Sequence, residues 1–278
     1  MKIGFLGFGE VASTLAKGLL EHGVEVSTCI TGRSSKTVLK AEEIGVNLFD
    51  SNAELAKNSD MLLSTVVPGQ AVNVAQEIEG NFKGIYVDLN NVAPYTVKKC
   101  SKFLINCKVV DAAIIGSIRS GLKTPIIASG KHSHEFAKLN DYGMNIEVIG
   151  DEVGQASSIK LLRSSFTKGI AALLFETMFA AYKMGLEEKV LEFISRTECP
   201  EFKDSSKSRI ISSAYHSNRR LQEMEEIVQF LSDSNDLLMS RATLEFYENL
   251  DNNFDHFKKR PEDYQEIFNK LKKNLSEK

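Results

Sequence analysis

Short apolar runs alternate with helical patterns through the first half of the chain. Between Lys2 and about Gly150, seven runs have the length and the branched or aromatic content typical of buried strands. They are "KIGFLG", "EVSTCIT", "MLLSTVV", "GIYVDL", "KVVDAAII", "PIIAS" and "IEVIG". The segments between them, such as "VASTLAKGLLEHG", place apolar residues at helical spacing. This alternation predicts an α/β fold with a Rossmann-type, doubly wound, mostly parallel sheet that helices cover on both faces.

The pattern changes beyond Asp151, where strand-like runs stop and helical spacing continues. One long helix is expected from about Gln155 to Met184. Its second half is apolar on nearly every face, which predicts burial among other helices or against a second subunit. Further helices are expected in "EKVLEFISR", "SSKSRIISSAYHSNRRLQEMEEIVQFLSD", "LLMSRATLEFYENL" and "PEDYQEIFNKLKKNL". We therefore predict a dinucleotide-binding domain over residues 1–152 and an all-helical substrate and dimerisation domain over residues 153–278, built on the long helix.

Composition and charge limit the kinds of partner that the protein is expected to bind. The 278 residues carry a formal net charge of -3, so no strong basic field favours nucleic acid or an anionic membrane surface. Glu176 and Lys183 interrupt the longest apolar run, which falls short of the roughly 20 residues of a membrane span. The four cysteines lack C-x-x-C spacing, as expected for reduced thiols. We predict a cytoplasmic protein with no nucleic-acid or membrane partner.

A glycine motif stands where the first predicted strand ends and a helix begins. It reads G-x-G-x-x-A over residues 7 to 12. The first glycine permits a tight turn, the second lets the backbone approach a pyrophosphate, and the helix N-terminus supplies free N–H donors. The alternative is a glycine-rich turn that binds nothing. We predict a bound dinucleotide contacted by Gly7, Phe8, Gly9, Glu10 and Val11.

The segment after the second predicted strand, "ITGRSSK", selects between the two nicotinamide dinucleotides. NAD sites usually place an Asp or Glu there to bond the ribose 2′-hydroxyl. Here Arg33 can pair with a 2′-phosphate, and Thr31, Ser34 and Ser35 add polar groups. This favours NADP as cofactor over NAD. An arginine solvated in a surface turn is the alternative.

Two further loops follow strands at the same edge of the predicted sheet, "STVVPGQA" and "VDLNNVAPYT". Parallel sheets bind ligands outside the carboxyl ends of their strands, so these loops are expected to reach the nicotinamide half. The predicted contacts are Val66, Val67, Pro68 and Asn90. The asparagine could equally be a turn residue that caps the next helix.

Four stretches together resemble the β-hydroxyacid dehydrogenase superfamily, the group of 6-phosphogluconate and 3-hydroxyisobutyrate dehydrogenases. They are the glycine motif, "DLNNVAP", "VDAAIIGSIRSGLKTPIIASG" and "GQASSIKLLRSSFTKG". The last stretch and "YHSNRRLQEMEE" are similar to a branch of NAD(P)-dependent oxidoreductases with its own C-terminal domain type. The resemblance implies that Lys160 is the catalytic acid/base. The Asn that the superfamily usually has four residues later is Ser164 here.

The substrate pocket is where the chain departs from the superfamily. The motif D-A-P-V-S-G-G corresponds to residues 111 to 117, so Ile115 replaces the serine that holds the substrate carboxylate. We expect substrate contacts from Gly116, Ser117, Arg119, Arg163 and His216. The arginines next to His216 could equally be solvated and paired with glutamates. Lys168, on the same helical face as Lys160, has no assigned role, and "KHSHE" is too weak a pattern to predict a metal.

The sequence thus predicts an NADP-dependent oxidoreductase and homodimer that transfers a hydride between nicotinamide and a small, anionic hydroxy acid or its keto form. Lys160 would accept the alcohol proton if burial and a neighbouring cation lower its pKa. The alternative for Lys160 is a side chain that reaches from an apolar helix to solvent. Two other functions stay open: an imine (C=N) reductase on the same fold, and a dinucleotide-binding sensor or scaffold without turnover.

Overall fold

The computed structural model describes residues 1–199, 201–232, 237–253, 257 and 259–276. The chain divides into two compact units, Met1–Leu161 and Leu162–Lys278. Each unit is described here by itself. The domain boundary expected after residue 152 stays a prediction.

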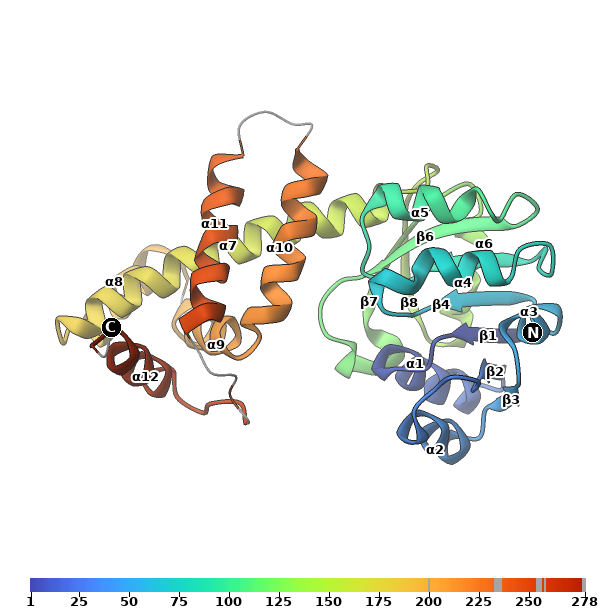
Figure 1. Ribbon diagram of the computed structural model, residues 1–278, viewed down its shortest axis with the longest axis horizontal. Coiled ribbons are helices and arrows are strands. Elements are labelled where there is room, and N and C mark those ends of the chain that lie inside the picture. Colours follow the sequence, from blue (N-terminus) through green and yellow to red (C-terminus); the bar gives the residue numbers. More distant parts are fainter. Residues whose placement is uncertain (200, 233–236, 254–256, 258, 277–278) are drawn as a thin grey trace. The chain divides into compact units, whose positions relative to one another are not determined.

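The first unit is built on one eight-stranded sheet (Figure 1). Its strand order is β3-β2-β1-β4-β5-β6-β7-β8, and only the β6–β7 pair is antiparallel. The predicted α/β fold class is therefore confirmed. The strands are β1 (Lys2–Leu6), β2 (Glu25–Cys29), β3 (Asn47–Phe49), β4 (Met61–Ser64), β5 (Ile85–Asp88), β6 (Lys108–Ile114), β7 (Pro125–Ser129) and β8 (Asn145–Gly150).

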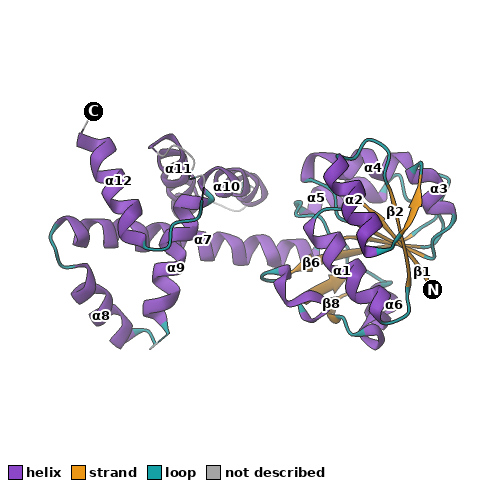
Figure 2. Cartoon of the chain, turned by 90° about the horizontal axis from the view of Figure 1, so that it is seen from below, coloured by secondary structure: helices purple, strands orange, loops and turns teal. Residues whose placement is uncertain are grey.

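Helices cover both faces of this sheet, as Figure 2 shows for the orange strands between purple helices. They are α1 (Glu10–Glu21), α2 (Ser35–Ile44), α3 (Asn52–Lys57), α4 (Ala71–Glu77), α5 (Pro94–Ser101), α6 (Ser133–Ala137) and the 3₁₀ helices η1 (Pro68–Gln70), η2 (Ile118–Lys123) and η3 (Lys138–Tyr142). Side chains alternate between two cores because a strand has a period of two. Ile3 and Phe5 join Leu15 of α1 in one core, whereas Leu6 joins Leu55 of α3 in the other.

One strand, β3, has no counterpart among the seven predicted runs. It spans three residues at the edge of the sheet, begins with Asn47, and is only partly buried. Short edge strands with polar positions lack the continuous apolar run of a central parallel strand. The hydrophobic pattern therefore could not identify it.

The second unit is helical, as predicted. Its elements are the later turns of α7 (Gln155–Lys183), then α8 (Glu187–Thr197), α9 (Phe202–Tyr215), α10 (Ser217–Leu231), α11 (Leu238–Asn253) and α12 (Tyr264–Ser276). The long helix agrees with the expected Gln155–Met184 to within one residue. Aromatic side chains dominate the core, where Phe175 meets Phe268 edge to face with 5.3 Å between ring centroids. None of the described helices combines the length and the apolar character that a membrane span requires.

The segment expected to be helical from residue 205 to 233 is two helices in the described part of the chain. Helix α9 ends and α10 begins at His216, whose φ of -115° and ψ of 26° are not helical. The first residue of α10, Ser217, donates a hydrogen bond of 2.6 Å to Asp251 of α11. This contact holds the new direction of the chain against α11, and periodicity alone cannot reveal it.

Candidate active site

Gly7 lies where β1 meets β4 at the point where the strand order reverses. Its φ is +87°, and an added Cβ would lie 2.9 Å from the carbonyl oxygen of Thr65. The Thr65 hydroxyl in turn donates a hydrogen bond of 3.0 Å to the Gly7 carbonyl. Only glycine fits this turn without strain. The glycine motif therefore begins at the crevice where doubly wound sheets bind ligands.

Gly9 occupies a different kind of position. It precedes α1 with extended backbone, φ -85° and ψ -157°, and no side chain caps the first N–H groups of the helix. An added Cβ would meet open space. Uncapped helix N-termini present N–H donors and the positive end of the helix dipole. The backbone here is open to an anionic group such as a pyrophosphate.

Arg33 has a donor without a partner. Its side chain is partly buried after β2, and its Nε atom is buried without a hydrogen-bond partner among the described residues. Buried guanidinium donors are normally satisfied, so this atom marks a place for an acceptor. Ser34 caps α2 by accepting from the N–H of Thr37 at 3.3 Å, and the Thr31 hydroxyl donates to the carbonyl of Asp50. Ser35 is exposed at the first position of α2.

Asn90 joins the loops that follow β4 and β5. Its Oδ1 accepts the N–H of Val66 at 2.7 Å, and its Nδ2 donates to the Ser64 hydroxyl at 2.9 Å. The side chain is 4% exposed, so its main structural role is to fix the loop that carries Val67 and Pro68. Val67 is two-thirds exposed, with 67% of its surface accessible, and can offer an apolar face to a ligand. Cofactor contacts by these residues stay predictions.

A buried carboxyl that the sequence analysis did not identify lies beside Lys160. Asp88 ends β5; its Oδ1 accepts the N–H of Asn90 at 3.0 Å, and its Oδ2 has no hydrogen-bond partner among the described residues. Burial raises the pKa of Asp88 to about 7, and Asp111 adds to the rise. The hydrogen bond from Asn90 and the positive charge of Lys160 act in the opposite direction. The available signal was a carboxylate at the carboxyl end of a buried strand.

Asp111 fixes the start of the long helix. Its Oδ2 accepts the N–H groups of Gly154 and Ser157 at 3.0 Å each, and its Oδ1 accepts the Ser157 hydroxyl. A carboxylate at a helix N-terminus satisfies free donors and complements the helix dipole. Strand β6 is thereby tied to the first turn of α7. This anchor determines where Lys160, at the next turn, is held relative to the sheet.

The predicted substrate loop follows β6. Gly116 has a φ of +107°, and Ser117 begins η2 by accepting the N–H of Arg119 at 3.3 Å. Gly116, Ser117 and Arg119 are all exposed, whereas Ile115 is half-buried with its N–H bonded to Pro125. The loop is therefore open to a ligand at the carboxyl end of β6. Substrate contacts by these residues stay predictions.

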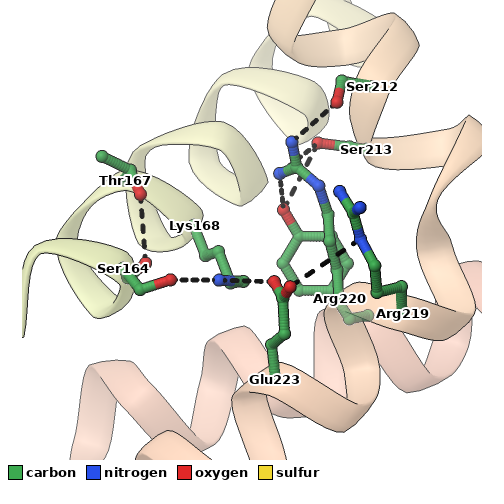
Figure 3. Close-up of polar contacts among 9 residues, drawn as sticks. Ser164, Thr167, Lys168, Ser212, Ser213, Arg219, Arg220 and Glu223 are labelled. Atoms are coloured by element: carbon green, nitrogen blue, oxygen red, sulfur yellow. Dashed lines mark hydrogen bonds and ion pairs between the residues drawn. The ribbon is translucent and has the colours of Figure 1, made fainter. Parts of the chain in front are cut away.

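The helical unit holds a second polar cluster, drawn in Figure 3. Lys168 of α7, 5% exposed, donates to the Ser164 hydroxyl and pairs with Glu223 of α10 at 2.9 Å. The Nε of Arg219 lies 3.7 Å from the same carboxylate. Ser164, predicted as a catalytic partner of Lys160, thus has Lys168 as its hydrogen-bond partner. Its catalytic role stays a prediction.

Arg220 completes this cluster. Its guanidinium donates to the Tyr247 hydroxyl at 2.8 Å and to the Ser212 hydroxyl at 3.0 Å (Figure 3). Burial lowers the pKa of His216, and the positive charges of Arg219 and Arg220 lower it further. The structure therefore brings His216 and the two arginines together, as their spacing predicted. Arg163 is exposed on α7.

One family model matches a segment within each of the two units. Residues 2–91 match the family model "NADP oxidoreductase coenzyme F420-dependent", and residues 181–250 match "Domain of unknown function (DUF1932)". A 28.5 kDa protein of Methanothermus fervidus is 45% identical over 235 residues, which cover 84% of this chain and 92% of the relative. These matches cover both units.

Solved structures show a similar fold. One is a conserved protein of unknown function with structural similarity to 3-hydroxyacid dehydrogenases. It is 45% identical, covers 91% of this chain and 97% of its own, and has a TM-score of 0.82. The 3-hydroxyisobutyrate dehydrogenase of Mycobacterium tuberculosis shares the fold at 14% identity and a TM-score of 0.76, with 97% and 98% of the two chains covered. An imine reductase of Myxococcus stipitatus in complex with NADP+ also shares the fold, at 16% identity and a TM-score of 0.58. The match covers 98% of this chain and 99% of the reductase.

Proposed function

The chain belongs to the β-hydroxyacid dehydrogenase superfamily, in a branch with its own C-terminal domain type, and on this premise we propose that it is an NADP-dependent oxidoreductase. The proposed reaction moves a hydride between the nicotinamide ring and a small hydroxy acid or its keto counterpart. One observation supports it above the others. A dinucleotide cradle at Gly7 and Gly9 and a lysine coupled to a buried carboxyl occur in the same α/β unit.

The residues present fit the cofactor. The uncapped start of α1 at Gly9 would hold the pyrophosphate, and the unsatisfied Nε of Arg33 would donate to a 2′-phosphate. Val67 and Pro68 would pack near the nicotinamide, in a loop that Asn90 fixes. When bound, NADP supplies the acceptor or donor of the hydride.

Lys160 would move the proton. In oxidation, the carbon gives up a hydride, its hydroxyl oxygen becomes a carbonyl oxygen, and the hydroxyl proton passes to neutral Lys160. In reduction, the protonated lysine returns that proton to the oxygen. Asp111 holds the first turn of α7 through Gly154 and Ser157, which sets the position of Lys160. Asp88 provides a carboxyl whose pKa of about 7 lets it stabilise the protonated lysine when it is ionised.

Fluorescence titration of NADPH and NADH tests the cofactor. We expect tighter binding of NADPH, and we expect Arg33→Gln to weaken it at least about tenfold, the equivalent of one charged hydrogen bond. NADH binding should change little in that variant. Lys57→Gln, which removes the same charge from an exposed position in the same unit, serves as the control. Equal, weak binding of both nucleotides by the wild type would refute the role of Arg33.

Turnover of a hydroxy-acid panel tests the chemistry. Lys160→Met should lower kcat by about 10²- to 10⁴-fold, the usual contribution of a general acid/base. Its NADPH dissociation constant should stay that of the wild type. Lys183→Met, at the exposed last position of α7, is the matched control. Full activity in the Lys160 variant would remove the lysine from the proposed mechanism.

Imine reduction is a second candidate because Ile115 stands where the superfamily has a carboxylate-binding serine. An apolar side chain at this place favours a substrate without a carboxylate there, and an iminium already carries the proton that a ketone must receive. A cyclic imine should then turn over with NADPH even in Lys160→Met. Loss of both activities in that variant would exclude this alternative.

We also propose that the protein is a homodimer and that it is located in the cytoplasm. The exposed apolar residues Leu162, Phe166 and Leu173 follow one side of α7 and are consistent with a homodimer built on that helix. The cytoplasmic location is proposed from the reduced thiols that the cysteine spacing predicts.

A further inference from the structure

A small cavity opens beside Lys168 in the helical unit. Its volume is about 160 Å³, and its polar lining consists of Thr167, Lys168, Arg209, Arg219, Arg220 and Glu223. Four of these side chains are cationic, and Glu223 is the one carboxylate among them. Three helices, α7, α9 and α10, contribute to this wall. The cationic groups therefore converge although they are far apart in the sequence.

The carboxylate does not balance these charges. Glu223 is shared by Lys168 at 2.9 Å and Arg219 at 3.7 Å. Arg220 donates to hydroxyl groups, those of Tyr247, Ser213 and Ser212. The guanidinium of Arg209 has neither an ion pair nor a hydrogen bond to any described residue. Lys168 is buried, Arg209 and Arg220 are half-buried, and Arg219 is exposed at the rim. With four cationic side chains and one carboxylate in its lining, the cavity carries an excess of positive charge.

The guanidinium of Arg220 is held in a fixed orientation that suits the binding of an anion. Its guanidinium is held by three hydroxyl groups and lies over the Tyr247 ring, with its central carbon 5.7 Å from the ring centroid. Such a fixed, planar group loses little entropy when it binds an oxyanion. Burial lowers the pKa of Lys168, and the nearby charges of Arg220 and Arg219 lower it further. A bound anion would relieve this repulsion.

The size of the cavity limits the ligand. Ligand pockets for whole small molecules usually measure about 300–1,000 Å³, and a water occupies about 30 Å³ in the liquid. The cavity therefore has room for one charged group rather than for a whole cofactor. We propose that it binds a tetrahedral oxyanion, such as inorganic phosphate or the phosphate group of a small phosphomonoester. This site goes beyond the proposed function, because no step of hydride transfer enters it.

Isothermal titration of the full chain with inorganic phosphate, at constant ionic strength and with chloride as the competing anion, tests this site. We expect Arg209→Gln to weaken phosphate binding about tenfold or more, as expected when a charged donor is lost. The variant should fold normally because Arg209 has no described partner to lose. Arg196→Gln, on the surface of α8 where it pairs with Glu192, should bind as the wild type does.

Two further titrations distinguish this cavity from the nucleotide site and identify the source of the anion. Arg33→Gln removes a donor from the predicted nucleotide site, so phosphate binding that disappears there but persists in Arg209→Gln would overturn the proposal. Equal affinity of the wild type and Arg209→Gln would overturn it as well. Glycerol 3-phosphate, titrated in parallel, separates the two sources of the anion: tighter, Arg209-dependent binding of the ester indicates a phosphorylated metabolite, and binding of inorganic phosphate alone indicates a free anion.

Discussion

Replacing Asp88 by asparagine should stabilise the protein at neutral and alkaline pH. The Asp88 carboxyl is fully buried, and its Oδ2 atom has no hydrogen-bond partner among the described residues. Asparagine keeps an Oδ1 that can accept the N–H of Asn90, now 3.0 Å away, and it removes the buried negative charge. Removing a buried charge that desolvation disfavours is one of the few single changes that can increase stability.

The magnitude follows from the pKa of Asp88, which is about 7 in the folded protein against an ordinary value of 3.8. Below the lower value both states are protonated, and the carboxyl has no effect on stability. Between the two values the unfolded chain is ionised while the folded one is not, so wild-type stability falls as pH rises. Above about 7 the loss is complete. A shift of about three pKa units at about 1.4 kcal/mol each gives a ceiling of about 4 kcal/mol.

Urea unfolding of wild type and Asp88→Asn between pH 4.5 and 8.5 measures this effect. The advantage of the variant should grow by up to about 1.4 kcal/mol per pH unit towards pH 7 and then level off. Lys160 will reduce the plateau, because the substitution also removes the carboxylate that attracts it. Asp60→Asn, at an exposed position before β4, reports the effect of the same substitution without burial. A variant that is less stable by a constant amount at every pH would show that Asp88 is a stabilising ion, contrary to this reasoning.

Three further substitutions test the architecture of the α/β unit. Gly7→Ala should lower the free energy of unfolding by about 1–3 kcal/mol, because it strains the left-handed turn. Gly9→Ala should leave the urea midpoint unchanged and weaken NADPH binding at least about tenfold, since its Cβ would point into open space needed by the pyrophosphate; equal effects of both alanines on stability would contradict this division. Ser157→Ala should cost about 1–2 kcal/mol, because Asp111 loses a buried donor; an unchanged urea midpoint would show that the hydroxyl does not anchor α7.

The parts of the fold that the sequence predicted well share a physical cause. The central strands are largely buried and appear as short apolar runs, and the edge strand β8 keeps enough apolar residues to be recognised with them, so seven of the eight were predicted. The long helix was predicted closely because Gly154 and Gly185, both with positive φ, flank it. The edge strand β3 and the break at His216 depend on neighbours that only the folded chain supplies.

The residues of the candidate site that local sequence patterns mark were predicted, and those that depend on tertiary contacts were not. The glycine motif and Arg33 are local signals, since a turn and the helix after it can be read from adjacent residues. Asp88 was missed because its significance depends on burial and on the charge of Lys160. Arg209 was missed for a related reason, whereas Glu223 was expected to pair with the arginines of its own helix and does so with Arg219. The contacts of both residues with the cavity beside Lys168 were not expected. Arg209 and Glu223 approach Lys168 from α9 and α10, and no spacing along one helix reveals such a convergence.

The two lysines on one face of α7 can now be assigned different roles. Lys168 lies 2.9 Å from Glu223 and donates to Ser164, so losing its proton would break an established ion pair in a place where the charge is 5% exposed. Burial and the charges of Arg220 and Arg219 lower the pKa of Lys168, whereas the Glu223 carboxylate favours its protonated form. Lys160 interacts with Asp88, a carboxyl whose own charge is suppressed by burial until about pH 7. The different carboxylate partners, Asp88 for Lys160 and Glu223 for Lys168, are consistent with the proposed division into proton transfer at Lys160 and anion binding beside Lys168.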